Sequence, residues 1–356
     1  MKTPVAVLGA TGTVGQKFVR LLADHPWFEL VAVAASSNSA GRSYRDAVRW
    51  REAGELPSSI GQLPVRDCTP PLPGAVVFSA LDAEVAGPIE QAFAKAGATV
   101  VTNTRTHRME PDVPLLIPEV NPEHVALVDC QRETRGWSGA ILANPNCSTA
   151  ALALALAPLH RAFGIEQLFV STMQAVSGAG YPGVPSLDIV GNVIPYVGGE
   201  EEKIERESRK ILGRFASGTV EPAAITLSVH SNRVAVVDGH LLTVSVGFRE
   251  RVSPAAAASA LREFRAPAPV AALPSSPNPP VEVDERTDRP QPRLDLNRGG
   301  GMAVTVGRIR ACPILDLRLV VLGHNTVRGA AGQGVQIAEL LLASGRIPQP
   351  SGGRGR

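Results

Sequence analysis

Short apolar runs alternate with amphipathic stretches through the N-terminal part of this sequence. The apolar runs have the length and composition of buried parallel strands, and the stretches between them have helical periodicity. Strand patterns lie at 4–8, 29–35, 75–80 and 99–102, and helical patterns at 16–23 and 86–95. This alternation predicts an α/β fold with a Rossmann-type, doubly wound parallel sheet. Apolar runs at 115–117 and 140–142 would complete that sheet.

The pattern changes after residue 147. An apolar helix is predicted at 150–159 and a charged helix at 200–212, with strands at 167–173, 225–229, 233–237 and 241–248. Several strands in series predict a second, α+β domain with a mainly antiparallel sheet. The remaining predictions are a proline-rich, ordered surface loop at 266–292, strand-like sequence again at 302–306, a closing helix at 327–343 and a disordered tail at 351–356.

A glycine loop follows the first strand and precedes the first helix. Its glycines are Gly9, Gly12 and Gly15, a variant of the dinucleotide-binding fingerprint. Glycines let the backbone approach a pyrophosphate, and the helix start supplies N–H donors. We therefore expect the cofactor to contact the loop residues Gly9, Thr11, Gly12, Thr13, Val14 and Gly15.

The end of the second strand bears on the choice between NAD and NADP. An acidic residue at this point would bind the ribose 2′-hydroxyl of NAD. This chain has Ser36, Ser37, Asn38 and Ser39 instead, with Arg42 nearby. Hydroxyl donors without a carboxylate favour the 2′-phosphate of NADP.

Cys147 lies where a loop becomes the apolar helix, in the run Asn144-Pro145-Asn146-Cys147-Ser148-Thr149. We expect Ser148 or Thr149 to cap this helix. A thiol at a helix start faces unpaired N–H groups and the positive end of the dipole, which lower its pKa. That pattern indicates a nucleophile for acyl transfer, but a small buried hydrophobic residue is an equally good interpretation of a lone cysteine.

Composition narrows the class of protein. The chain has 356 residues, 44% of them hydrophobic, which is enough for two domains with substantial cores. A net charge of +2 gives no reason to expect nucleic acid or an anionic membrane as a partner. The four cysteines lack the Cys-x-x-Cys spacing of a zinc site, so no metal is expected. No signal peptide or membrane-spanning run is found, which predicts a reduced, cytosolic enzyme.

Several motifs, in order along nearly the whole chain, resemble those of aspartate-semialdehyde dehydrogenase in its archaeal and fungal-type branch. They are Gly9 to Gly15, His107 to Asp112, Asn144 to Thr149, Gln174 to Gly180, Gly199 to Lys203, Arg233 through Asp238-Gly239-His240, and His324 to Gly329. The resemblance implies NADPH-dependent reduction of 4-phospho-L-aspartate to L-aspartate 4-semialdehyde and phosphate. This step leads to lysine, methionine and threonine.

The resemblance also implies roles for individual residues. Cys147 would form an acyl-thioester and His240 would be the acid/base, a task that suits a near-neutral pKa. Arg233 would grip the substrate carboxylate. The other implied substrate and phosphate contacts are Arg108, Asn146, Gln174, Glu200 and Lys203, and the other implied cofactor contacts are Ser79, Ala80, Ser177, Gly178 and Asn325. Taken alone, Glu200 and Lys203 fit an ordinary surface ion pair equally well, and Arg108 fits a surface charge.

Spacing bears on the pairing of Arg233 with His240. If Asp238-Gly239 is a two-residue hairpin turn, Val237 pairs with His240. Arg233 then shares a sheet face with Val237, roughly 13 Å away along the strand. An arginine and a four-carbon substrate together would bridge that separation. A solvent-facing strand arginine is the alternative.

The same resemblance predicts the domain organisation. Residues 1–147 would bind NADP, residues 148–326 would form the catalytic and dimerisation domain, and the helix at 327–345 would pack back on the first domain. A homodimer or homotetramer is expected, and 187–196 fits an interface or an exposed loop.

The sequence departs from the pattern of this family at two positions, and two rival functions remain open. Ala235 stands where proline is expected, and no basic residue lies beside Asn38, which weakens the preference for NADP over NAD. A malonyl-CoA reductase would use the same scaffold. A non-catalytic NADP-binding sensor would need neither Cys147 nor His240.

Overall fold

The computed structural model describes residues 1–347 and divides into two compact units. Among the described residues, the first unit contains Met1–Pro114, Val125–Asn144 and 334–347, and the second contains Leu115–His124 and Pro145–Gln333. The predicted tail at 351–356 lies outside the described residues. Within residues 1–347, no helix has the length and apolar character needed to cross a membrane.

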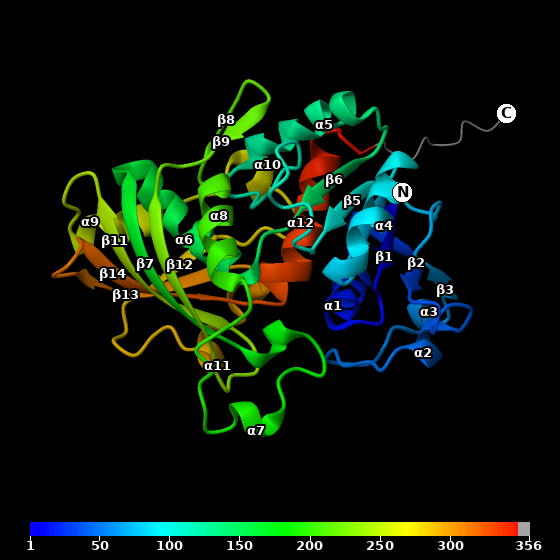
Figure 1. Ribbon diagram of the computed structural model, residues 1–356, viewed down its shortest axis with the longest axis horizontal. Coiled ribbons are helices and arrows are strands. Elements are labelled where there is room, and N and C mark those ends of the chain that lie inside the picture. Colours follow the sequence, from blue (N-terminus) through cyan, green and yellow to red (C-terminus); the bar gives the residue numbers. More distant parts are fainter. Residues whose placement is uncertain (348–356) are drawn as a thin grey trace. The chain divides into compact units, whose positions relative to one another are not determined.

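The first unit is built on a six-stranded sheet in which every pairing is parallel (Figure 1). The strand order is β3-β2-β1-β4-β5-β6, which confirms the predicted Rossmann-type sheet. The strands are β1 (Thr3–Leu8), β2 (Phe28–Ala35), β3 (Val65–Asp67), β4 (Val76–Ser79), β5 (Thr99–Thr102) and β6 (Ala140–Ala143). The short edge strand β3 was not predicted.

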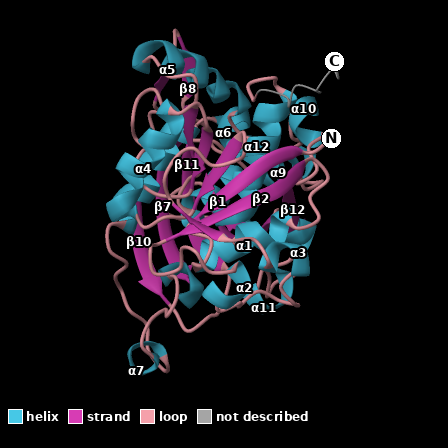
Figure 2. Ribbon diagram, turned by 90° about the vertical axis from the view of Figure 1, so that its right-hand side faces the viewer, coloured by secondary structure: helices cyan, strands magenta, loops and turns pink. Residues whose placement is uncertain are grey.

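Helices pack on this sheet, and the core of the unit lies between them and the strands (Figure 2). Helix α1 packs on β1 and β2, α4 on β4 to β6, and α5 on β6. The ring of Phe18 on α1 stacks on that of Phe78 on β4, with centroids 4.9 Å apart. The helices of this unit are α1 (Thr13–Leu22), α2 (Tyr44–Ala47), α3 (Ser58–Gly61), α4 (Ala83–Lys95), α5 (Leu127–Arg135) and α12 (Gly332–Ala343), the last of which belongs here from Gly334 onward.

The predicted strand at 115–117 is wrong. The segment is fully buried, as its apolar sequence requires, but it belongs to the second unit and forms no strand: only Leu115 makes a single bridge, and the six strands of the first sheet do not include it. The side chain of Asn121 replaces a strand partner, since its Oδ1 accepts from the Ile117 N–H at 2.8 Å and its Nδ2 donates to the Leu115 carbonyl at 2.9 Å.

The second unit contains a mixed six-stranded sheet in the order β10-β7-β11-β14-β13-β12. Three of its five pairings are antiparallel, which agrees with the predicted, mainly antiparallel sheet, whereas β7 with β10 and β12 with β13 are parallel. The strands are β7 (Ile165–Gln174), β10 (Thr226–Arg233), β11 (His240–Phe248), β12 (Val281–Asp284), β13 (Val304–Ala311) and β14 (Leu317–Gly323), with a separate hairpin of β8 (Arg214–Ala216) and β9 (Thr219–Glu221).

The predicted strand at 233–237 and its hairpin are also wrong. Strand β10 ends at Arg233, and β7 lies between β10 and β11 in the sheet, so Val237 does not pair with His240. The loop after β10 instead bonds to the loop after β7, where the Val176 N–H donates to Val236 at 2.8 Å and the Ser177 N–H to Val237 at 3.1 Å.

One apolar helix occupies the centre of the second unit. Helix α6 (Cys147–Phe163) packs on β7, β11, β13 and β14 and also contacts α8 (Glu200–Ile211) and α9 (Pro254–Glu263). A helix that is covered on several sides must be apolar around its circumference, which explains the run of alanine and leucine. The shorter helices are α7 (Ser186–Ile189), α10 (Ala268–Ala271) and α11 (Pro292–Asp295).

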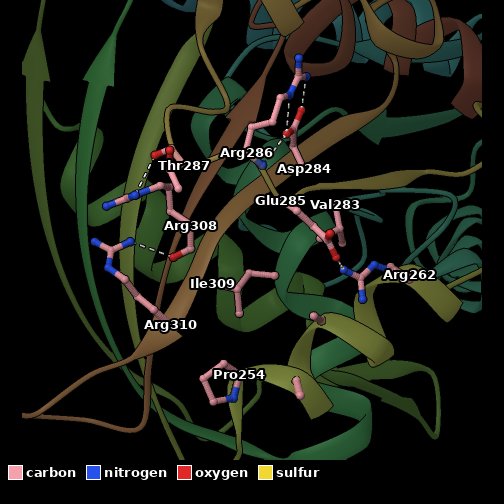
Figure 3. Close-up of a pocket in the computed structure, with 12 residues that line it drawn as sticks. Pro254, Arg262, Val283, Asp284, Glu285, Arg286, Thr287, Arg308, Ile309 and Arg310 are labelled. Carbon is pink, nitrogen blue, oxygen red and sulfur yellow. Dashed lines mark hydrogen bonds and ion pairs between the residues drawn. The ribbon is translucent and has the colours of Figure 1, made fainter.

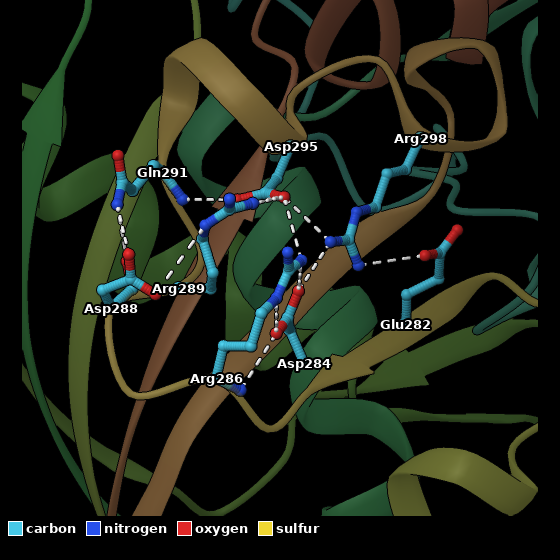
Figure 4. Close-up of polar contacts among 8 residues, drawn as sticks. All are labelled: Glu282, Asp284, Arg286, Asp288, Arg289, Gln291, Asp295 and Arg298. Atoms are coloured by element: carbon cyan, nitrogen blue, oxygen red, sulfur yellow. Dashed lines mark hydrogen bonds and ion pairs between the residues drawn. The ribbon is translucent and has the colours of Figure 1, made fainter.

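The segment at 266–292 is more structured than predicted. It contains α10 and the edge strand β12, and the chain after β12 is held by the ion pairs in Figure 4. The buried carboxylates of Asp284 and Asp295 both accept from Arg298 Nη2, at 2.6 and 2.8 Å. Arg286 pairs with Asp284 and holds the pKa of that carboxyl well below its usual range. Proline in this segment therefore accompanies an ordered, charge-stabilised connection.

A buried ion pair ties Leu115–His124 to the rest of the second unit. Arg328, in the helical turn η4 (Val327–Ala331), donates from Nη2 to Glu119 Oε1 at 2.7 Å and from Nη1 to Oε2 at 3.1 Å. Both side chains are fully buried. Arg328 Nε also donates to the Met302 carbonyl at 2.6 Å.

Replacing Glu119 with glutamine should therefore destabilise the protein strongly, because it leaves the Arg328 charge buried without its counter-ion. We expect the free energy of unfolding to fall by about 3 kcal/mol, measured by denaturant unfolding. Glu221→Gln, which breaks the exposed Arg214–Glu221 pair, is the control and should change little. Equal effects of the two substitutions would contradict this view of the buried pair.

Candidate active site

Cys147 is the first residue of α6, and Asn146 is its N-cap. The Asn146 Oδ1 accepts from the backbone N–H groups of Ser148 at 2.9 Å and Thr149 at 3.2 Å. The prediction that Ser148 or Thr149 caps the helix is therefore wrong. The helix begins at Cys147 and not at 150 as predicted, so Ser148 and Thr149 lie inside it and supply the amides that the cap satisfies.

Two carboxylates from α8 hold Asn146 in place. The Asn146 side-chain amide donates to Glu200 Oε2 at 2.7 Å, and its backbone N–H donates to Glu207 Oε2 at 2.6 Å. Glu207 is buried and was not predicted as a site residue. Its signal in the sequence is the spacing of seven from Glu200, which puts both carboxylates on one face of a helix.

Glu200 accepts hydrogen bonds from two further side chains. Lys203 Nζ donates to Glu200 Oε1 at 2.8 Å, and Gln174 Nε2 approaches Oε2 at 3.4 Å. Burial alone would raise the pKa of Glu200, but Lys203 and the amides of Asn146 and Gln174 together lower it. The carboxylate is therefore ionised, and four predicted substrate-binding residues form one network beside Cys147.

Cys147 and His240, the predicted nucleophile and acid/base, lie in contact. His240 begins β11 and is fully buried, and its Nε2 lies 3.1 Å from Cys147 Sγ. Burial and the charge of Arg233 lower the pKa of His240 to about 3, against the opposing effects of Glu200 and the Gly239 carbonyl. The ring is therefore neutral near pH 7.

Arg233 is close to this pair although the predicted hairpin is absent. The guanidinium is buried at the end of β10, and its Nη1 donates to the Ala175 carbonyl at 2.7 Å. Burial lowers the pKa of Arg233, while the nearby Cys147 and Glu200 raise it. Among residues 1–347, the other nitrogens of this guanidinium have no hydrogen-bond acceptor, so they can bind a carboxylate.

The loop after β7 packs closely on these groups. A Cβ at Gly178 would lie 2.8 Å from Arg233 Nη1 and 3.0 Å from His240 Cε1. Asn325 joins this loop to the start of β11, since its Oδ1 accepts from the Gly239 N–H and its Nδ2 donates to Ser177 Oγ, both at 2.8 Å. The cofactor contacts predicted for Ser177, Gly178 and Asn325 remain predictions. The structure shows the contacts of these residues within the protein.

Gly329 was also missed. A Cβ on Gly329 would lie 2.5 Å from the Cβ of Cys147, so any side chain at this position would displace the nucleophile. Its signal in the sequence is its place in the His324 to Gly329 motif. Ala175 was also not predicted. Its backbone carbonyl accepts from Arg233 and its backbone N–H donates to His240, and such backbone contacts leave no signal in the residue type.

The glycine loop lies in the first unit at the carboxyl end of β1. Gly9 has a φ of +70°, and a Cβ there would lie 2.4 Å from the Ala80 carbonyl oxygen. A Cβ on Gly15 would lie 2.1 Å from the Gly9 carbonyl oxygen. The start of α1 has no side-chain cap, so its first N–H groups can serve a phosphate.

Buried hydroxyls near this loop also fit a bound dinucleotide. In the part of the chain that the structure describes, Thr13 Oγ1 and Ser79 Oγ are buried without a hydrogen-bond partner. Such atoms usually bind a ligand or water. After β2, Ser36 and Ser37 are exposed and Ser39 is partly exposed, so their hydroxyls are accessible. Of the loop's polar atoms, the Thr11 carbonyl accepts from Gln16 Nε2 at 2.9 Å.

Arg108 also belongs to the first unit. It is buried in the loop after β5, where its Nη2 donates to the Asn103 carbonyl at 2.9 Å. His107, beside it, lies 2.7 Å from Glu110 and 3.3 Å from Glu90. Arg108 is therefore part of an ordered loop, and its contact with substrate remains a prediction.

A pocket of about 460 Å³ lies between α9, β12 and β13 (Figure 3). Its lining includes Arg262, Arg286, Arg308 and Arg310 but none of the predicted site residues. Arg262 pairs with Glu285, and Arg308 donates to the Thr287 carbonyl at 2.7 Å. The pocket is separate from the Cys147 and His240 pair.

Comparison with known proteins places the chain in a class of dehydrogenases. Residues 4–128 match the family model "Semialdehyde dehydrogenase, NAD binding domain", and residues 156–328 match "Semialdehyde dehydrogenase, dimerisation domain". The aspartate-semialdehyde dehydrogenase of Archaeoglobus fulgidus is 48% identical over 96% of this chain and 98% of its own, and that of Saccharomyces cerevisiae is 46% identical over 97% and 99%. The chain belongs to the aspartate-semialdehyde dehydrogenase family.

Solved structures agree. The crystal structure of the Candida albicans aspartate-semialdehyde dehydrogenase with NADP has a TM-score of 0.90 and 43% identity, covering 98% of this chain and 100% of that one. The Vibrio cholerae aspartate-semialdehyde dehydrogenase II with ASA has a TM-score of 0.76 and 27% identity, covering 96% and 98%. The archaeal and fungal relatives match the predicted branch of the family.

Replacing Gly329 with alanine should disable the nucleophile, because the new methyl group would occupy the space of the Cys147 side chain. We expect activity to fall by about a hundredfold, as for a displacement of about 1 Å in a reacting group. Gly198→Ala is the matched control, since a Cβ there would lie at an ordinary contact distance of 3.8 Å from Tyr196 Oη. A fully active Gly329→Ala enzyme would show that Cys147 is not held in this way.

The low pKa of His240 predicts a dependence of stability on pH. Between pH 3 and 6.5 the unfolded chain protonates this ring and the native chain does not, so stability falls as the pH falls through this window. His240→Gln should reduce the slope by roughly 1.4 kcal/mol per pH unit, measured by denaturant unfolding at about pH 4.5 and 5.5. Identical slopes in the two proteins would show that the native ring protonates normally.

Proposed function

We propose that this chain catalyses the reversible, NADPH-dependent reduction of 4-phospho-L-aspartate to L-aspartate 4-semialdehyde and phosphate through an acyl-thioester on Cys147. This is the step that leads to lysine, methionine and threonine. The observation that carries the proposal is the 3.1 Å contact between Cys147 Sγ and His240 Nε2 at the start of α6. Membership of the family and the ionised, hydrogen-bonded groups beside this pair support it.

Cys147 is the nucleophile. Its thiolate attacks the acyl carbon of the substrate, a C–S bond forms, and the negative charge passes to the carbonyl oxygen. Collapse of this oxyanion breaks the bond to the phosphate oxygen and leaves the thioester. Bound NADPH supplies the hydride that reduces the thioester carbon. Breaking the C–S bond then releases the aldehyde and restores the thiolate, while His240 serves as the acid/base group beside these atoms.

The substrate is held by charge. The free guanidinium nitrogens of Arg233 bind its carboxylate in a bidentate way. Lys203 and Arg108 bind the phosphate, and Glu200 with Gln174 and Asn146 binds the α-amino end of the substrate. Glu200 suits this task, because its lowered pKa keeps it anionic.

The two predicted domains have separate tasks in this proposal. Residues 1–147 bind NADP through the glycine loop and the hydroxyls of Ser36, Ser37 and Ser39. Of the predicted helix at 327–345, only the part from Gly334 belongs to the first unit and completes that domain, because Val327–Gln333 lies in the second unit. Residues 148–326 carry catalysis and the contacts between subunits of a homodimer or homotetramer. The name of the family model at 156–328 supports the second assignment.

The direct test is reduction of NADP by the purified protein with L-aspartate 4-semialdehyde, followed at 340 nm with and without phosphate. We expect reduction only when phosphate is present, because phosphate must release the acyl group from Cys147. Phosphate-independent or absent turnover would overturn the proposal. Reduction of malonyl-CoA would then identify a CoA-thioester reductase, and binding of NADP without any turnover would identify a sensor.

Replacing Cys147 with alanine should abolish turnover, because no other group can form the thioester. Binding of NADPH, measured by fluorescence titration, should persist. Cys312→Ala is the control, since this thiol lies in the turn between β13 and β14 and is expected to be dispensable. Substantial activity in Cys147→Ala would exclude the thioester route.

A further inference from the structure

The ring of His107, in the loop after β5, lies between two carboxylates. It is buried, with Nδ1 2.7 Å from Glu110 Oε1 and Nε2 3.3 Å from Glu90 Oε2. In the described part of the chain, neither His107 Nε2 nor Glu90 Oε2 has another hydrogen-bond partner. A ring nitrogen without a proton would point its lone pair at a carboxylate oxygen, so both nitrogens are placed to donate.

We infer that His107 is a buried imidazolium that holds the next residue, Arg108, in position to bind phosphate. His107 is thus a positioning residue, because it acts through the loop that carries Arg108 and does not itself touch the substrate. The assignment of phosphate to Arg108 rests on the proposed function, whereas the charge of the ring does not.

Glu90, on α4, is arranged to accept a proton from the ring. Its carboxylate is fully buried, and its Oε1 accepts from Thr102 Oγ1 at 2.6 Å. The same hydroxyl oxygen accepts from the Thr104 N–H at 3.0 Å, which directs the hydroxyl proton to Glu90. A carboxylate is less basic than an imidazole, so the proton shared between Glu90 and His107 lies on the ring.

Glu110 connects the ring to α5. Its Oε2 accepts from Arg135 Nη2 at 2.5 Å, and Arg135 also donates to both oxygens of Asp112, each at 2.5 Å. Burial alone would lower the pKa of His107, but the hydrogen bonds and charges of Glu90 and Glu110 outweigh burial and raise it. The ion pairs of this network therefore favour the charged ring.

The charges of the network balance only when the ring is protonated. Its three carboxylates are those of Glu90, Glu110 and Asp112, and its two guanidinium groups are those of Arg108 and Arg135. The imidazolium supplies the third positive charge. Among residues 1–347 it is also the one cation that pairs with Glu90, which would otherwise be a buried carboxylate without a counter-ion.

The same contacts fix the turn that carries Arg108. The Glu110 N–H donates to the His107 carbonyl at 3.1 Å, and the Arg108 N–H donates to the Arg105 carbonyl at 3.3 Å. The side chains of His107 and Glu110 also bind each other, so Arg108 lies between two anchored residues. Its Nη2 donates to the Asn103 carbonyl at 2.9 Å, which sets the direction of the guanidinium.

The charge of the ring can be measured on the full-length protein labelled with 15N-histidine, with the His107 signals assigned by their loss in His107→Gln. We expect both nitrogens to have the shifts of an imidazolium at about pH 7.5, roughly one unit above the ordinary pKa of histidine. In Glu90→Gln, whose amide can donate to Nε2, the ring should be neutral at that pH. A neutral ring in the wild-type protein, or a charged ring in Glu90→Gln, would overturn the inference.

The KM for phosphate tests the positioning role in the phosphate-dependent reduction of NADP. His107→Gln should raise this KM by about tenfold, the cost of losing an outer partner that orients a binding group. The KM values for NADP and L-aspartate 4-semialdehyde should change little. His230→Gln, at an exposed position of β10, is the control and should leave all three values unchanged. An unchanged KM for phosphate in folded His107→Gln, or an equal rise in all three values, would overturn the positioning role.

Failure of the proposed function is distinguishable from failure of this inference. The spectra of the wild-type protein need no turnover and do not depend on the folding of His107→Gln. If the wild-type protein lacks activity, titration calorimetry of its NADP complex with inorganic phosphate makes the same comparison, and we expect about tenfold weaker binding in His107→Gln. No binding of phosphate by the wild-type protein would overturn the positioning role together with the assignment of Arg108.

Discussion

The position of Cys147, the proposed nucleophile, depends on the hydrogen bonds of a single residue, Asn146. Its Oδ1 satisfies two amides at the start of α6, its side-chain nitrogen binds Glu200, and its backbone nitrogen binds Glu207. A buried polar group without a partner costs about 1–3 kcal/mol. Losing any one of these hydrogen bonds would therefore destabilise the whole arrangement. Together they fix where α6 begins, and therefore where Cys147 points.

This arrangement places two carboxylates close to a group that must become an anion. Negative charge at Glu200 and Glu207 opposes ionisation of the thiol, and the helix dipole contributes only about 0.3–1 kcal/mol in its favour at exposed sites. Arg233 and Lys203 supply the compensating positive charge, the first near sulfur and the second on Glu200. The site is thus a balanced cluster of charges, and the carboxylates that position the nucleophile depend on the cations that bind substrate in the proposed mechanism.

The sequence predicted most of the elements because their signals are local. The strands of the first sheet and the helices α1, α4, α6 and α8 follow from periodicity within each segment. The errors concern partners that lie far along the chain. Periodicity in 233–237 could not reveal that β7 separates β10 from β11, and burial of 115–117 could not reveal that Asn121 replaces a strand. The short strand β3 has too few residues to establish a pattern, and β12, which is as long as β4, was missed because it lies inside a proline-rich segment.

The same distinction applies to the candidate site. Residue type, motif and resemblance pointed to Cys147, His240 and Arg233, and the structure brings these three side chains together. Glu207 accepts a hydrogen bond from the Asn146 backbone N–H, and the Ala175 backbone N–H donates to His240. Both contacts depend on the folded geometry and not on residue type. Sequence reasoning therefore identifies the reacting groups more readily than the groups that set their protonation and direction.

Glycine shows why a motif does not by itself reveal a role. Gly178 is predicted to contact the cofactor, and the structure adds that a Cβ there would lie against Arg233 and His240, while a Cβ on Gly329 would lie against Cys147. At both positions a side chain would occupy the space of a reacting group, so packing alone requires glycine. Backbone contacts of this kind are stiffer than contacts between long side chains, because they have no rotamers to adjust. Cys147 and His240 are therefore positioned on one side by amides that donate hydrogen bonds to carboxylates, and on the other by closely packed backbone.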